Sequence, residues 1–430
     1  VYNFALIGNL RTYIFEDVVR RTLEYAGYKV RHIMNITDVD DKTIRASRAA
    51  GKSLKEFTRY YENFFKADLK KLNISYPEKF TRATEHVSEM IKVISALLER
   101  GLAYKTDGSV YFDISKFKPY GKLAHLDLKG LKAGARVDVD EYTKENVQDF
   151  VLWKAYRSGE PYWSSPFGRG RPGWHIECSA MSTKYLGQPF DLHAAAVDLI
   201  FPHHENEIAQ SEGASGKEFV RYWMHGEHLL VNGKKMAKSL GNVFSLRDIE
   251  NHGFNPSAFR YLILTSHYRS KLNFTWESLE AAQNSLERLY DFVINLKSQT
   301  SILKSKTVLP VRRWGDKYRK RFENAIFNDL DTPKALSVTW DLLHEYNKNP
   351  SRYNPKDVLT LLYEFDRVFG VGFDQVRPGK NPAEVVELLK KREEYRQKGE
   401  WQKADAIRAA IKKLGYLVED TSRGPKIKKQ

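Results

Sequence analysis

Three side chains in the middle of the sequence are of the types that bind transition metals. Cys178 is the only cysteine among 430 residues, and His203 and Glu207 lie four residues apart in the stretch HHENEIAQ. If this stretch is helical, the imidazole and the carboxylate lie on one face. A thiolate, an imidazole and a carboxylate are all good ligands for Zn²⁺. The alternative is a small buried cysteine and a structural HHE cluster at a helix end, and the residues alone leave both interpretations open.

Two lysines suggest a second kind of chemistry. Lys235 and Lys238 lie three residues apart in KKMAKSLGN, residues 234–242. A mobile, positively charged loop of this kind can stabilise phosphate oxygens on which charge develops in a transition state. A lysine-rich turn is more often only a solvated surface. Phosphate binding is favoured here because a phosphate-type turn, LIGN at residues 6–9, lies far upstream in the first α/β unit.

The chain is strongly basic. It has 70 Lys and Arg against 54 Asp and Glu, which gives a formal net charge of +16. This excess favours a polyanionic partner, first of all a nucleic acid, although a solvated surface is the alternative explanation. The single cysteine excludes an intrachain disulfide and indicates a reducing compartment, and no apolar run approaches the roughly 20 residues of a membrane span. We therefore expect a cytoplasmic protein with no membrane partner.

The elements that would position these residues alternate at the start of the chain. The opening VYNFALIG predicts a strand, residues 14–27 predict a helix, and KVRHIMNIT predicts a second strand that leads into the acidic turn DVDD. This order indicates a parallel α/β unit whose ligand crevice lies at the strand ends. Helices are also expected over 53–72 and 85–100. Residues 109–165 lose the helical period and predict an insertion of short strands and turns.

From Trp276 onward the sequence pattern changes from alternating strands and helices to helices. Apolar residues recur there at steps of three and four, which predicts a helix packed in a bundle core. A charged helical pair is expected over 383–414, before the basic end GPKIKKQ. The predicted seam of the first bundle helix consists of Leu279, Ala282, Leu286, Leu289, Val293 and Leu296.

Several short motifs of the sequence occur in the order known from one enzyme family. The chain resembles the class I aminoacyl-tRNA synthetases, and specifically the cysteinyl-tRNA synthetases, from its first residue to beyond residue 273. The helical remainder, with DLDTPKAL and KADAIR, matches more loosely. The matching words are NITDVDDK, GARVDV, DFVLWK, GRPGWHIECSAM, FPHHENEIAQS, YWMHG, KMAKSLGN and HYRSKLNF.

The resemblance implies an α/β fold with a Rossmann-type catalytic core and a connective insertion, followed by an all-α helical bundle and a small C-terminal anticodon-binding domain. The expected boundaries are 1–108 for the first half of the core, 109–165 for the insertion, 166–215 for the second half of the core with the zinc site, 216–275 for a junction with the lysine loop, 276–375 for the bundle and 376–430 for the anticodon-binding domain.

The resemblance also implies roles for individual residues. Lys235 and Lys238 would be the catalytic groups, acting on the phosphates of ATP. In the structural alternative, Trp174 is a core aromatic residue, and Thr37 and Asp198 are turn caps. The implied set is Gly8, Asn9, Asp198 and Lys238 for ATP, Thr37 and Trp174 for the amino acid, and Cys178, His203 and Glu207 for zinc.

The implied activity is the ligation of cysteine to tRNA(Cys) through a cysteinyl-adenylate, with ATP and Mg²⁺ as substrate and Zn²⁺ as cofactor. A monomer with tRNA(Cys), cysteine and ATP as partners is expected. One alternative is a tRNA-binding relative, natural or engineered, that has lost activation. Another is a ligase that joins cysteine to a small amine, which the basic charge and the C-terminal helices disfavour.

The sequence departs from the family pattern in the ATP site and in the metal site. Leu6 and Asn9 stand where the first class I motif normally has histidines; Asn9 can still donate a hydrogen bond, but Leu6 has no polar group. Ala195 and Ala196 replace glycines beneath the adenine, where they add methyl groups and resist positive φ. Family members take a further zinc cysteine from the strand before the first motif, and this sequence begins after that position. We therefore expect reduced activity and a more open metal site.

Overall fold

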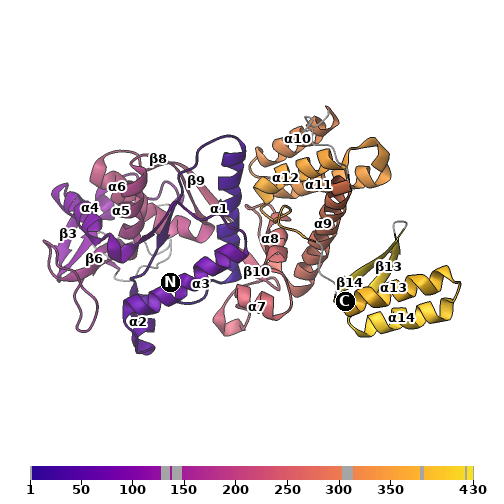
Figure 1. Ribbon diagram of the computed structural model, residues 1–430. Coiled ribbons are helices and arrows are strands. Elements are labelled where there is room, and N and C mark those ends of the chain that lie inside the picture. Colours follow the sequence, from indigo (N-terminus) through magenta and orange to yellow (C-terminus); the bar gives the residue numbers. More distant parts are fainter. Residues whose placement is uncertain are drawn as a thin grey trace. The chain divides into compact units, whose positions relative to one another are not determined.

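The structure is a computed structural model, shown in Figure 1, and it describes residues 2–126, 136–137, 148–302, 313–377, 382–421 and 424–429. The chain divides into two compact units, Val1–Asp374 and Gln375–Gln430. Within the described residues, no helix is both long enough and apolar enough to cross a membrane.

The first unit opens with helix α1, Ile7–Tyr25. The strand expected over residues 1–8 and the helix start expected at residue 14 were both wrong: among residues 2–6 only Leu6 makes a β-bridge, to Ser245. The helix begins at Ile7 because Ile7 and Leu10 continue the buried face of Ile14, and all three are fully buried. The apolar period of three and four therefore runs further back than the sequence analysis assumed.

Short parallel strands and helices make up the rest of the first half of the core. Strand β1, Ile33–Ile36, pairs in parallel with β2, Lys79–Arg82, and the expected second strand is confirmed. The helices expected over 53–72 and 85–100 are confirmed as well. The helices here are α2 (Asp41–Ala49), α3 (Leu54–Lys71), the 3₁₀ turn Ala83–Glu85 and α4 (Val87–Glu99).

A mostly antiparallel sheet follows, in the order β3-β4-β6-β5, with β7 paired to β6. Its strands bury aromatic side chains; Phe112 stacks on Phe150 with ring centroids 5.0 Å apart. Most of the motif GARVDV, quoted above for the family resemblance, lies outside the described residues. The elements are β3 (Ala103–Thr106), β4 (Ser109–Phe112), the 3₁₀ turn Ile114–Lys116, β5 (Arg136–Val137), β6 (Asp149–Ala155) and β7 (Gly170–Pro172).

The second half of the core returns to parallel pairing. Strand β8, Phe190–Ala196, pairs in parallel with β9, Val220–Gly226, and a three-stranded sheet in the order β11-β10-β12 follows. The other elements are α5 (Trp174–Leu186), the turns Val197–Leu199 and Ile200–His204, α6 (Glu205–Ser215), β10 (Leu229–Val231), β11 (Lys234–Lys235), the turn Lys238–Leu240, α7 (Leu246–Asn251), α8 (Pro256–Leu264) and β12 (Leu272–Phe274).

A helical bundle completes the first unit (Figure 1). The predicted seam is confirmed, because all six of its residues lie in helix α9, Trp276–Ile302, and none exceeds 4% exposure. The remaining helices are α10 (Arg313–Ile326), α11 (Thr332–Lys348), the turn Pro350–Arg352 and α12 (Pro355–Phe369).

The second unit contains the expected helical pair, α13 (Ala383–Gln397) and α14 (Trp401–Lys413). It also contains a hairpin that the sequence analysis did not anticipate, β13 (Tyr416–Thr421) paired with β14 (Gly424–Lys429). Val418 of this hairpin packs with Val385 and Ile411 of the two helices in a small core. The basic end is therefore part of a folded element.

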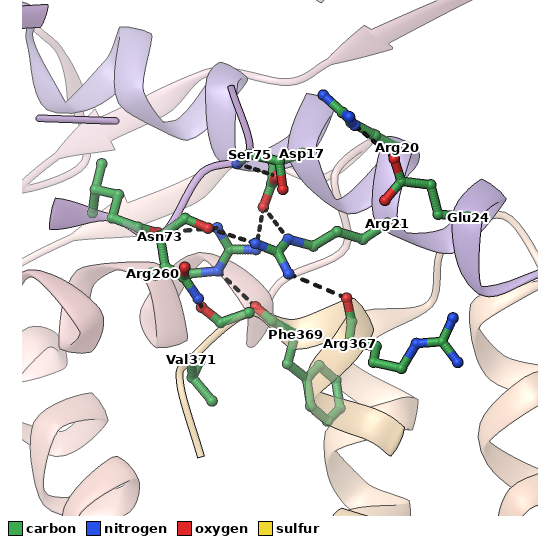
Figure 2. A network of polar contacts seen from close by, with 12 residues as sticks. Asp17, Arg20, Arg21, Glu24, Asn73, Ser75, Arg260, Arg367, Phe369 and Val371 are labelled. Carbon is green, nitrogen blue, oxygen red and sulfur yellow. Dashed lines mark hydrogen bonds and ion pairs between the residues drawn. The ribbon is translucent and has the colours of Figure 1, made fainter. Parts of the chain in front are cut away.

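A buried polar network joins the α/β core to the bundle (Figure 2). Arg260 of α8 donates to Asp17 of α1 at 2.5 Å, and both side chains have no exposed surface. Arg21 donates to the same carboxylate at 2.6 Å, and the backbone N–H of Ser75 donates to its other oxygen at 2.9 Å. Arg260 also donates to the carbonyl of Phe369 at the end of α12, at 2.6 Å. This carboxylate therefore holds elements together that are far apart in sequence.

We expect Asp17→Asn to lower the free energy of unfolding of the first unit by about 3–5 kcal/mol at pH 7, because it leaves buried guanidinium charge unpaired. Burial raises the pKa of Asp17, but Arg260, Arg21 and the Ser75 N–H outweigh it and hold the pKa below its ordinary value. A carboxyl group whose pKa is lower in the folded protein stabilises the folded state at pH values above its pKa in the unfolded chain, roughly 3.9. This stabilisation is lost as the pH falls through the lowered pKa of the folded state.

Urea unfolding at pH 7 and below pH 4 tests this expectation, and the difference between wild type and variant should shrink at the lower pH. Asp341→Asn is the matched control, since Asp341 pairs with Arg321 but its side chain is 50% exposed. An exposed ion pair contributes at most about 1 kcal/mol. Equal effects of the two substitutions would contradict a special role for the buried carboxylate.

Candidate active site

One large cleft, of about 2030 Å³, lies in the first unit where α1 begins and where β1 and β8 end. This is the place at which parallel α/β folds bind ligands. The side chain of Lys238 lies outside the described part, although its backbone begins the turn Lys238–Leu240. The other predicted site residues all line the cleft, namely Gly8, Asn9, Thr37, Trp174, Cys178, Asp198, His203, Glu207 and Lys235.

The predicted metal ligands come from three different elements of the second half of the core. Cys178 lies on α5, His203 on the turn before α6, and Glu207 in the first turn of α6. One ligand atom from each lies within 4.8 Å of the others. Folding therefore places a thiol, an imidazole and a carboxylate around a common point.

The geometry of this group suits a bound cation. Glu207 Oε1 lies 2.9 Å from His203 Nε2, yet among the described residues it has no hydrogen-bond partner. A buried carboxylate oxygen without a hydrogen bond is available to a cation. Burial raises the pKa of the Cys178 thiol, and the charges of Glu207 and Glu177 raise it further. A cation at this point would offset these effects, so the residues fit zinc.

Three further residues contact the group, and the sequence analysis did not assign any of them. Asn35 donates through Nδ2 to Cys178 Sγ at 3.5 Å. His193 Nε2 lies 3.0 Å from Glu207 Oε2, and His175 Nδ1 lies 2.8 Å from His203 Nδ1. Burial raises the pKa of Glu207, but the two histidines beside it lower it by more. The alternation of β1 could have revealed Asn35, which is exposed between the buried Met34 and Ile36.

His193 and His204 form a second group with Glu207, again with ligand atoms within 4.8 Å. His204 is fully buried and faces His225, with Nδ1 and Nε2 at 2.9 Å. Burial lowers the pKa of His204, and burial lowers that of His225 to about 4. Both shifts favour the neutral form of His204 and of His225.

The start of α1 and the lysine loop meet at the other side of the cleft. A Cβ atom on Gly8 would lie 2.4 Å from Met236 Cε, so the methionine occupies the space that Gly8 leaves open. The N–H of Ile7 donates to the carbonyl of Phe244 at 2.9 Å. The start of helix α1, at Gly8 and Asn9, therefore lines the same cleft as Lys235 of the lysine loop, an arrangement suited to anions.

Asn242 closes the lysine loop, a role that the sequence analysis did not assign. Its Oδ1 accepts from the N–H of Ala237 at 2.8 Å, and its Nδ2 donates to the carbonyl of Lys235 at 3.0 Å. The residue is the last letter of the quoted word KMAKSLGN. Lys235 itself is exposed at the end of the β10–β11 hairpin and can reach a ligand in the cleft.

The alanines of β8 do not strain the backbone. Ala196 has φ −80° and ψ 153°, and among the described non-glycine residues with positive φ there is no alanine. The expected conflict with positive φ was therefore wrong, because this segment is an ordinary parallel strand paired with β9. The added methyl groups remain, and Ala195 and Ala196 line the cleft.

Comparison with known proteins identifies the class of the catalytic core. Residues 1–284 match the family of class I (C) tRNA synthetase catalytic domains. A Mycobacterium tuberculosis methionyl-tRNA synthetase bound by methionyl-adenylate has a similar fold, with TM-score 0.61 and 16% identity over 90% of this chain and 92% of that chain. A LeuRS–tRNA complex from Agrobacterium radiobacter K84 gives TM-score 0.65 and 11% identity, over 87% and 82%. The fold and the cleft define a class I aminoacyl-tRNA synthetase.

Sequence similarity identifies the family within this class. Residues 379–426 match the anticodon-binding domain of cysteinyl-tRNA ligases. A cysteine–tRNA ligase from Chlamydia felis is 48% identical over 440 residues, which cover all of this chain and 92% of that protein. The enzyme from Protochlamydia amoebophila is 45% identical over 449 residues with the same coverage. The chain belongs to the cysteinyl-tRNA synthetase family, as the sequence analysis predicted.

Proposed function

We propose that the protein joins cysteine to tRNA(Cys) with ATP, supplied with Mg²⁺, as the energy source. A cysteine carboxylate oxygen attacks the α-phosphorus of ATP, and pyrophosphate leaves. The terminal hydroxyl of the tRNA then attacks the carbonyl carbon of the adenylate, and AMP leaves. The observation that carries this proposal is that one cleft is lined both by the Cys178 group and by Lys235 of the lysine loop.

Catalysis by this cleft requires positioning and charge stabilisation, with no side-chain nucleophile. Lys235, with Lys238 from the same loop, would contact the phosphates. Asn9, exposed in the first turn of α1, and Asp198, exposed in the turn after β8, line the cleft and would contact the nucleotide. Thr37 and Trp174 would shape the amino-acid pocket.

Zinc is the proposed cofactor, held by Cys178, His203 and Glu207. When bound, zinc prefers a thiolate ligand, which the hydroxyl of serine cannot supply at neutral pH. Trp174 covers this group from one side, because its ring centroid lies 4.4 Å from that of His203. A zinc site held by these residues would therefore favour cysteine over serine as the substrate.

A tRNA-binding relative with impaired activation is the second candidate, and Leu6, Ala195 and Ala196 favour it. A ligase for a small amine is disfavoured by the match of residues 379–426 to an anticodon-binding domain. The monomeric state and the cytoplasmic location expected from the sequence remain predictions of the main proposal.

Cysteine-dependent exchange of pyrophosphate into ATP separates the two candidates. We expect exchange with cysteine and at most background exchange with serine, followed by charging of tRNA(Cys) when tRNA is added. If tRNA is retained on filters but exchange stays at background, the impaired relative is correct. If neither exchange nor tRNA retention occurs even at low salt, both candidates are wrong.

A further inference from the structure

The turn between α10 and α11 has an unusual backbone. Asp329 and Leu330 are consecutive and both lie in the left-handed region, at φ 54° and 57°. Aspartate tolerates this region, whereas leucine rarely adopts it. Leu330 is 8% exposed and belongs to the main hydrophobic core. Such a conformation persists only where surrounding contacts hold it, and it is found disproportionately at functional sites.

The carboxylate of Asp329 receives three hydrogen bonds from the segment after α8. The Tyr268 hydroxyl donates to Oδ1 at 2.5 Å. Arg269 donates from Nε to Oδ2 at 2.6 Å and from Nη2 to Oδ1 at 3.1 Å. Tyr268 is fixed in turn, because its ring stacks on Phe15 of α1 with centroids 4.6 Å apart. The bundle turn therefore sets the direction in which the Arg269 side chain extends.

This ion pair lies at the cleft and is open to solvent. Arg269 and Asp329 both line the cleft, and their side chains are 60% and 42% exposed. An exposed pair contributes little to stability. The fixed geometry therefore needs another explanation, and a held guanidinium at the wall of a cleft is suited to a phosphate.

We infer that Asp329 is a positioning residue that holds Arg269 at the cleft wall to bind a backbone phosphate of the tRNA end that enters the cleft. This inference rests on the proposed function, because the tRNA terminus must reach the adenylate. Arg269 supplies the contact, and Asp329 acts only through Arg269. The direction in which Asp329→Asn changes tRNA affinity distinguishes a positioning role from a simple charge effect. Removing a negative charge near bound RNA would by itself tighten binding, whereas loss of a positioning residue weakens it.

The test measures tRNA(Cys) binding by filter retention over a range of salt concentrations. We expect Arg269→Gln to weaken binding about tenfold and to reduce the salt slope by about 1, as for one lost phosphate contact. Asp329→Asn should also weaken binding, and the double variant should bind no worse than Arg269→Gln alone. Arg269→Lys should keep part of the affinity, because it retains the charge without the planar fork.

Asp341→Asn is the matched control, because it also removes a partly exposed carboxylate paired with an arginine, but outside the cleft. It should leave tRNA binding unchanged or tighter. Pyrophosphate exchange by Asp341→Asn should stay within about twofold of wild type, and thermal unfolding should show that all variants are folded. If Asp329→Asn tightens binding as the control does, or if Arg269→Gln binds normally, the inference is wrong while the proposed function stands. Failure of the wild-type protein to bind tRNA would overturn both.

Discussion

Leu6→His raises the rate of cysteine activation about ten- to a hundredfold while the affinity for ATP changes little. Leu6 precedes the first turn of α1 and lines the cleft, but its side chain has no hydrogen-bond donor. An imidazole there can donate to a phosphate oxygen on which charge develops. A hydrogen bond to a charged group contributes about 1.5–3 kcal/mol, and each 1.36 kcal/mol changes a rate about tenfold.

The measurement is pyrophosphate exchange at saturating ATP, together with ATP binding in the absence of cysteine. Leu6→Met is the control, since it fills similar space without a donor and should leave the rate unchanged. The double change Ala195→Gly with Ala196→Gly should behave differently and chiefly improve ATP affinity, because it removes two methyl groups from the cleft wall without adding a contact to the phosphates.

If neither Leu6→His nor the double glycine change raises the rate at which the wild-type protein activates cysteine, the first class I motif is functional with Leu6. The structure is compatible with that outcome in one respect. Asn9 Oδ1 accepts from the N–H of Leu6 at 3.2 Å, so the turn is well formed without a histidine. The rate measurement therefore tests the chemistry of the side chain and not the shape of the turn.

Removal of Cys178 has the other large expected effect. We expect Cys178→Ser and His203→Ala each to abolish stoichiometric zinc in the purified protein. Substituting even an outer partner of a metal site costs about 10–100-fold, so loss of a direct ligand should lower cysteine activation at least about a hundredfold. Within the described residues the site offers three protein ligands where structural zinc usually has four, so it should bind zinc more weakly and leave a position for the substrate.

Metal analysis is the primary measurement, because it does not depend on activity. His344→Ala is the control for His203→Ala, since His344 is an exposed histidine of α11 that does not line the cleft. Asn35→Ala should give an intermediate loss of zinc, because Asn35 contacts only the ligand sulfur. Zinc content that survives both Cys178→Ser and His203→Ala would place the metal elsewhere in the protein.

The sequence by itself determined the family, the α/β core and several of the residues that line the cleft. Gly8, Trp174, Cys178 and His203 could be predicted because each lies in a short motif that resembles one of the cysteinyl-tRNA synthetase family. The helix α9 could be predicted for a related reason, since burial of one face imposes a local period of three and four. Patterns of this kind are contained within about 20 residues and need no knowledge of the partner elements.

The tertiary structure decided everything that depends on contacts between distant segments. Tyr268 and Arg269 meet Asp329 across about sixty residues, and Asp17 meets Arg260 across 243. No spacing in the sequence encodes such a pair, because a carboxylate on the surface of an isolated helix has the same local pattern as one that is buried by another element. The start of α1 and the relaxed backbone at Ala196 were likewise set by packing, since burial of Ile7 and pairing with β9 outweighed the local preferences of those segments.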